Sequence, residues 1–76
     1  MSKLPRISGL KAVKAFEKAG WTVVRISGSH HILRKSGVDA CLSIPIHKGQ
    51  NVGAGLLLSQ IKAAKLTVEA FIANLD

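Results

Sequence analysis

The sequence predicts an α+β fold in the order α-β-β-β-α-α, with a three-stranded antiparallel sheet and the helices on one of its faces. Apolar residues at helical spacing flank a central region rich in β-branched residues. Short glycine-containing turns divide that region, as in strands joined by hairpins. With 76 residues, 47% of them hydrophobic, we expect one domain over residues 1–76 with a core of its own.

The first helix is expected to follow Ser8, whose hydroxyl can cap it, and to end at Gly20, which tolerates a left-handed backbone. Leu10, Val13 and Phe16 are spaced as a stripe that faces the core.

Three strands are expected at residues 21–26, 31–35 and 40–46. Pro45 has no backbone N–H to donate, so it should lie on an edge strand or near a strand's end. The single cysteine, Cys41, is predicted to be a buried and inert thiol of the third strand.

A second helix is expected over residues 55–65, with Leu57 and Ile61 buried, and Thr67 can cap a last helix. Leu56 and Leu58 exceed what a one-sided helix needs, so they are expected to be exposed and to suit a protein contact. The last helix carries one apolar stripe, which consists of Val68, Phe71, Ile72 and Leu75.

The net charge of +7 comes from 11 Lys and Arg residues against 4 Asp and Glu. All the basic residues lie within residues 1–65, so the body of the domain should attract polyanions. Nucleic acid is the commonest such partner, and an acidic protein or a membrane surface is the alternative. No apolar run is long enough to span a membrane, and a single cysteine fits a reducing cytoplasm.

The sequence Gly28-Ser29-His30-His31 lies at a predicted join between two strands. Adjacent residues of a strand point to opposite faces, so the two histidines should not act as one pair. Histidine titrates near neutrality, which suits a general base for RNA cleavage, and His30 is the candidate. Gly28 allows close backbone approach, Ser29 adds a hydroxyl, and His47 could come near through the sheet.

No metal site or cofactor is expected, because the histidines and acids lack ligand spacing and no phosphate-binding loop motif is present. The base would instead activate the 2′-hydroxyl of RNA while cations neutralise the phosphate. The candidate cations around the strands are Arg25, Arg34, Lys35 and Lys48. Lys11 and Lys14 belong to a lysine row on the first helix, which is either a cationic ridge for RNA or a solvated face.

Five segments together form a recognisable pattern: Lys3-Leu4-Pro5, Ala19-Gly20-Trp21, Gly28-Ser29-His30-His31, Ile44-Pro45-Ile46-His47 and residues 55–67. Through them the chain resembles, over nearly its whole length, the HicA (YcfA-like) family of toxins from type II toxin–antitoxin systems. The sequence departs from the family's usual G-T-L-R-S-I pattern at Gly55-Leu56-Leu57-Leu58-Ser59-Gln60.

The resemblance implies a fold like that of double-stranded-RNA-binding domains and an mRNA interferase activity that halts translation. It implies that His30 is catalytic, with His47 in a supporting role, and that a HicB-type antitoxin covers the site. Two alternatives remain open at this point: a non-catalytic RNA-binding module, and a protein-interaction domain whose charge docks on an acidic partner.

Overall fold

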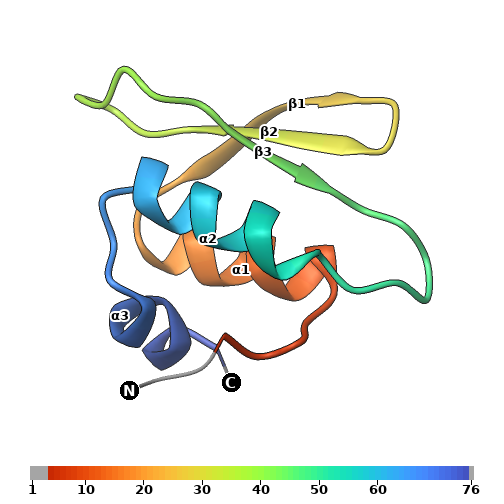
Figure 1. Cartoon of the computed structure of the whole chain (residues 1–76). Helices are drawn as coiled ribbons and strands as arrows, with labels where there is room; N and C mark the ends of the chain where they lie inside the picture. Colours follow the sequence, from red (N-terminus) through yellow and green to blue (C-terminus); the bar gives the residue numbers. More distant parts are fainter. Residues whose placement is uncertain (1–3, 76) are drawn as a thin grey trace.

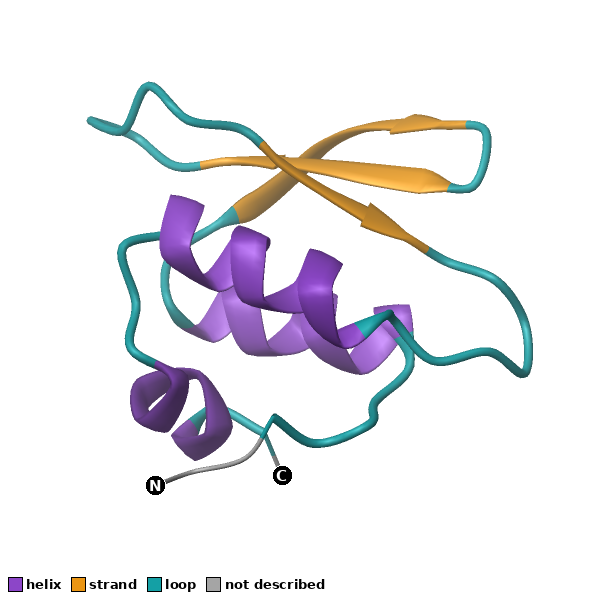
Figure 2. Ribbon diagram, in the orientation of Figure 1, coloured by secondary structure: helices purple, strands orange, loops and turns teal. Residues whose placement is uncertain are grey.

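The computed structural model describes residues 4–75, and its elements follow the predicted order. They are α1 (Gly9–Lys18), β1 (Thr22–Ser27), β2 (His30–Arg34), β3 (Leu42–Pro45), α2 (Ala54–Ala63) and α3 (Val68–Ala73). The strands form one antiparallel sheet in the order β1-β2-β3, and the helices all lie on the same side of it (Figure 1). The predicted α-β-β-β-α-α fold is therefore confirmed, and no helix of residues 4–75 covers the other face of the sheet (Figure 2).

The predicted caps of the first and last helices are confirmed, whereas α2 spans Ala54–Ala63 instead of the expected residues 55–65. Ser8 caps α1 by accepting a hydrogen bond from the Lys11 N–H at 3.3 Å, and Thr67 caps α3 by accepting one from the Ala70 N–H at 3.0 Å. Gly20 follows α1 with φ of +100°, a left-handed conformation that glycine adopts without strain. Within residues 4–75, no helix combines the length and the apolar character needed to cross a membrane.

The strands are shifted or shortened relative to the prediction. Trp21 precedes β1 and is buried at 2% exposure, whereas β2 begins one residue earlier than expected and so includes His30. β3 is four residues long, because its pairing with β2 extends only from His30–Pro45 to Leu33–Leu42. Pro45 is the last residue of an edge strand, as its missing N–H predicts.

The core lies between the sheet and the helices. Phe16 of α1 and Phe71 of α3 meet with ring centroids 4.9 Å apart and planes tilted by 46°. The fully buried side chains of the sheet and of α2 complete the layer: they are Leu33, Leu42, Ile44, Leu57 and Ile61.

Two predictions of burial are wrong. Leu10 is 54% exposed, because the helix presents Gly9, Ala12 and Val13 to the core in its first turns. Cys41 is exposed rather than buried, because it precedes β3 and lies outside the paired strand. Its sulfur accepts a hydrogen bond from Arg34 Nη1 at 3.2 Å.

The apolar stripe of α3 is only partly correct. Phe71 is fully buried, whereas Val68, Ile72 and Leu75 are half-buried. In α2, Leu57 and Ile61 are buried as predicted and Leu56 is exposed, but Leu58 is half-buried.

Replacing Phe71 by Ala is expected to lower the free energy of unfolding by about 3–5 kcal/mol, because it removes a buried ring and its contact with Phe16. Leu10→Ala should change it by less than about 0.5 kcal/mol, because that side chain is mostly in solvent. Urea unfolding followed by circular dichroism measures both, and equal losses would contradict this account of the core.

Candidate active site

The two faces of the sheet separate the adjacent histidines. His31 and Leu33 lie on the face that the helices cover, since Leu33 and its partner Leu42 are fully buried. His30 lies on the opposite face, together with Arg34. The uncovered face is called here the open face of the sheet.

His30 opens β2 directly after the turn formed by Gly28 and Ser29. It is exposed, and its neighbours across the sheet are Ser27 on β1 and Pro45 on β3. Gly28 has φ of +59°, which places it in the left-handed region at the first position of a two-residue hairpin turn. The sharp turn therefore presents the imidazole at the rim of the open face.

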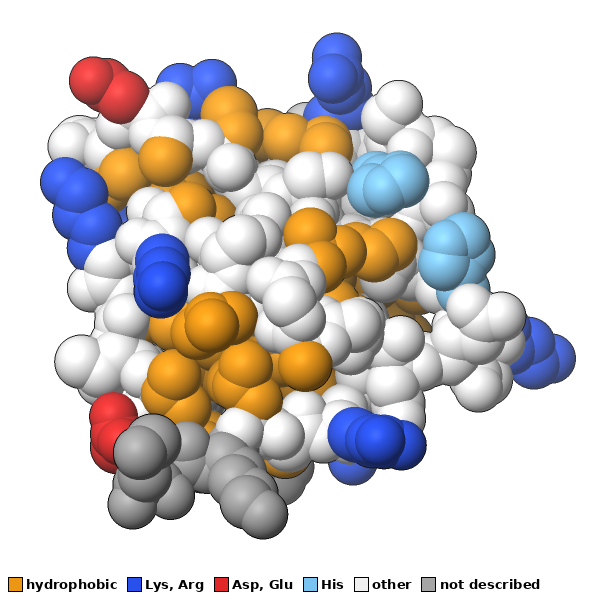
Figure 3. Space-filling model, viewed as in Figure 1, with side chains coloured by type: hydrophobic (Ala, Val, Ile, Leu, Met, Phe, Trp, Pro, Cys, Tyr) orange, Lys and Arg blue, Asp and Glu red, His pale blue; other side chains and the backbone are white. Residues whose placement is uncertain are grey.

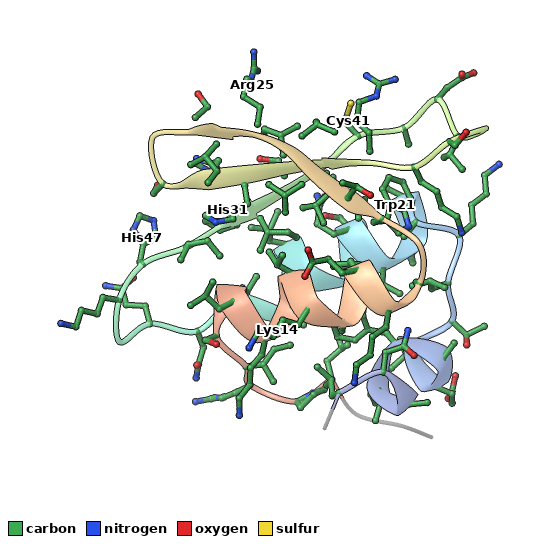
Figure 4. All side chains as sticks on the ribbon, turned by 180° about the vertical axis from the view of Figure 1, so that it is seen from behind. Lys14, Trp21, Arg25, His31, Cys41 and His47 are labelled. Carbon is green, nitrogen blue, oxygen red and sulfur yellow. The ribbon has the colours of Figure 1, made fainter. Side chains whose placement is uncertain are left out.

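His47 is held near this turn by the chain that precedes it. The Ile46 N–H donates to the Ser29 carbonyl at 2.7 Å, which joins the end of β3 to the β1–β2 turn. Figure 4 shows the His47 side chain directed toward that turn, and Figure 3 shows histidine side chains exposed at this end of the molecule. The structure thus brings Gly28, Ser29, His30 and His47 to one end of the sheet.

His31 takes no part in this group. It is half-buried between the sheet and α1 (Figure 4), opposite Ile26 and Ile44, and its Nδ1 has no hydrogen-bond partner within residues 4–75. With His31 on the covered face, His, Cys, Asp and Glu side chains of the described residues form no group of three that could hold a metal ion.

Two of the predicted cations lie near His30 and His47. Arg25 pairs with Ile32, which makes it the diagonal neighbour of His30 on the open face, about 7–8 Å away between backbones. Its side chain is exposed and points away from the helices (Figure 4). Lys48 is exposed and directly follows His47.

Arg34 and Lys35 lie at the other end of β2. Arg34 shares the open face but is four residues, or about 13 Å, along the strand from His30. The Lys35 ammonium donates to the Ala19 carbonyl at 2.8 Å, which fixes it at the end of α1. The structure therefore does not bring these two cations together with the histidines.

Lys11 and Lys14 lie on the opposite side of the molecule from the open face. They line a groove of about 480 Å³ between α1 and the residues that follow α3. Lys14 extends from α1 away from the sheet (Figure 4). A ligand bound at His30 would have to wrap around the domain to reach these lysines.

The candidate site is an exposed surface. A second hollow of about 630 Å³ lies at the far end of the sheet beside Arg34 and Lys35. Neither hollow is lined by His30 or His47. An open surface of this kind suits a long polymer, whereas small-molecule sites are usually concave.

Two residues that hold the site in place were not singled out from the sequence. Gln60 of α2 accepts a hydrogen bond from the Ser43 N–H at 3.0 Å and so ties the edge strand β3 to the helix layer. Gly9 lies against the end of β3, and a glycine inside a helical pattern was the signal that could have found it. No comparable sequence signal marks Gln60.

Comparison with protein families supports the resemblance seen in the sequence. The model of the HicA toxin family of bacterial toxin–antitoxin systems matches residues 9–66, which is more than half of the chain and runs from the start of α1 beyond the end of α2. No curated protein matches this sequence.

Replacing Gly28 by Ala is expected to lower the free energy of unfolding by about 1–2 kcal/mol, because a Cβ is strained at φ of +59°. Gly55→Ala is the matched control: Gly55 lies within α2, where an added Cβ meets no atom within 4 Å, and alanine should stabilise the helix by about 0.5–1 kcal/mol. Chemical denaturation measures both, and a neutral Gly28→Ala would show that the turn does not depend on glycine.

Proposed function

We propose, from the premise that this chain belongs to the HicA toxin family, that it is a metal-independent endoribonuclease that cleaves mRNA. Family membership makes it the toxin of a toxin–antitoxin system with a cognate antitoxin as its partner. The observation that carries the proposal is the exposed His30 at the rim of an uncovered basic face, beside Arg25 and near His47.

In the proposed reaction the substrate supplies its own nucleophile. His30 removes the proton from a ribose 2′-hydroxyl, and the oxygen attacks the adjacent phosphorus. The bond from phosphorus to the 5′-oxygen of the next nucleotide then breaks, which leaves a 2′,3′-cyclic phosphate and a 5′-hydroxyl. DNA lacks the 2′-hydroxyl, so the reaction is specific for RNA.

Arg25 is the cation best placed to stabilise the phosphate during this attack. It is the diagonal neighbour of His30 on the open face, and its guanidinium can donate two parallel hydrogen bonds to phosphate oxygens. Negative charge on those oxygens grows as the new bond forms, so a fixed positive charge there stabilises the transition state.

The leaving 5′-oxygen must receive a proton, and His47 is the proposed donor. It is exposed and directed toward the turn that carries His30 (Figure 4). From the sequence, Lys35 or a water molecule could also serve as the donor. Lys35 lies five residues along the chain from His30, about 16 Å if extended, and is bound to the Ala19 carbonyl. The Lys35 ammonium is therefore too far from a 5′-oxygen that leaves beside His30 to donate a proton to it.

Cleavage of mRNA would halt translation and growth until the toxin is neutralised. The proposed antitoxin is of the HicB type and covers the open face around His30, which excludes RNA from the site. Because none of the described helices lies over this surface, a folded partner can cover it without displacing any of them.

His30→Ala is expected to reduce RNA cleavage by about 10²-fold or more, because it removes the general base. It should also abolish growth arrest on expression. The measurement compares the wild type and the variant on single-stranded RNA in the presence of EDTA, with the end groups of the products analysed. A 2′,3′-cyclic phosphate or 3′-phosphate is the expected end.

The control is His31→Gln, which changes the neighbouring histidine on the covered face and should retain cleavage once circular dichroism confirms its fold. Products with a 3′-hydroxyl, full activity of His30→Ala, or loss of activity with EDTA would each contradict the proposal. RNA that is bound by the wild type but never cut would favour the non-catalytic RNA-binding module instead.

Arg25→Ala is expected to slow single-turnover cleavage by about 10²-fold, because it removes a fixed charge beside the reacting phosphate. Lys14→Ala removes the same charge from the opposite side of the domain and should leave the cleavage rate of a short RNA unchanged. Equal losses in the two variants would mean that positive charge only attracts RNA to the protein, and that Arg25 does not stabilise the reacting phosphate.

A further inference from the structure

Gly9 lies in the first turn of α1 where no side chain could fit. The residue is buried, and a Cβ added to it would overlap the carbonyl oxygen of Pro45. The same Cβ would lie 2.7 Å from Cδ1 of Ile46, closer than such atoms approach in proteins. The backbone of α1 therefore touches the end of β3 directly.

Backbone freedom does not explain this glycine. Gly9 is helical and has no positive φ, so any residue could adopt its conformation. Within a helix, glycine is destabilising relative to alanine, because it loses more backbone freedom on folding. Glycine nevertheless occupies this position, because the close approach of Pro45 and Ile46 leaves no room for a Cβ.

The segment that Gly9 contacts is also bound on its other side. Pro45 is the partner of His30 across the sheet, and the Ile46 N–H donates to the Ser29 carbonyl at 2.7 Å. The end of β3 is thus held between the first turn of α1 and the turn that presents His30. His47 is the next residue of the chain.

The loop that begins at His47 also ends beside the start of α1. The Val52 N–H donates to the Ile7 carbonyl at 2.9 Å, and Ser8 forms an isolated antiparallel bridge with Asn51. Both ends of the segment 46–52 are therefore fixed on residues 7–9, immediately at the start of α1.

We propose that Gly9 is a positioning residue that sets the place of His47 relative to His30. The inference rests on the proposed function, in which these two histidines act on one phosphodiester. Gly9 touches neither RNA nor the reacting atoms. Because Gly9 has no side chain, α1 packs closely against Pro45 and Ile46. This close packing places the Ile46 N–H within hydrogen-bond distance of the Ser29 carbonyl.

The test is Gly9→Ala. The added methyl should push the Pro45–Ile46 segment outward and move the ring resonances of His47 in a two-dimensional NMR spectrum, while the resonances of α3 stay in place. Single-turnover cleavage should fall by about 10²-fold, the loss that a displacement of about 1 Å can produce. RNA affinity should remain within about twofold, because Arg25 and the other cations are unchanged.

Two controls separate positioning from loss of stability. Gly55→Ala makes the same change in α2, where the Cβ meets no atom within 4 Å, and should keep full activity. Phe71→Leu destabilises the core far from the site and should also keep the cleavage rate at temperatures where it is folded. Ile46→Val in the Gly9→Ala background should restore only part of the rate, because the overlap with the Pro45 carbonyl persists.

Unchanged His47 resonances with unchanged cleavage in Gly9→Ala would overturn the inference. So would unfolding of Gly9→Ala both alone and with Ile46→Val, because the glycine would then serve the whole fold and not the site. If the wild type itself cuts no RNA, the proposed function fails, and the NMR comparison still decides whether Gly9 places His47.

Discussion

The hydrogen bond from the Ile46 N–H to the Ser29 carbonyl is the contact on which the candidate site depends. β3 is a short edge strand with four pairs to β2, and short edge segments open more easily than central ones. The 2.7 Å bond extends the connection beyond the last pair and reaches the turn before His30. Together with the Pro45–His30 pair, it keeps Ile46, the residue before His47, against that turn.

Much of this fold follows from local chemistry that is visible in the sequence. Ser8 and Thr67 cap their helices, and Gly20 ends α1 with a positive φ, because each residue type satisfies a local backbone requirement. The alternation of side chains along a strand also separates His30 from His31 correctly, since it depends only on the two-residue period. The predicted ends of the strands agree less well with the structure, because pairing with a neighbouring strand decides where a strand stops.

What could not be predicted depends on how distant segments meet. The periodicity of α1 places Leu10 in the apolar stripe, but contact with β3 turns Gly9 toward the core and leaves Leu10 in solvent. For the same reason the sequence does not show that Lys14 and Arg25, both predicted to bind RNA, lie on different sides of the domain. A helical period tells which residues avoid the core, but not on which side of the domain they emerge relative to the open face.

The departure from the family pattern in α2 is understandable from the contacts of its residues. Leu57 is buried in the core, Leu56 is exposed, and Gln60 uses its side-chain oxygen to hold the Ser43 N–H of β3. The helix therefore keeps its contact with the edge strand through a hydrogen bond. The exposed start of α2 carries no charge, however, so on the proposed function the phosphates near His47 must be met by Arg25 and Lys48. The exposed Leu56 instead adds apolar surface at the start of α2, which favours contact with a protein partner over contact with RNA.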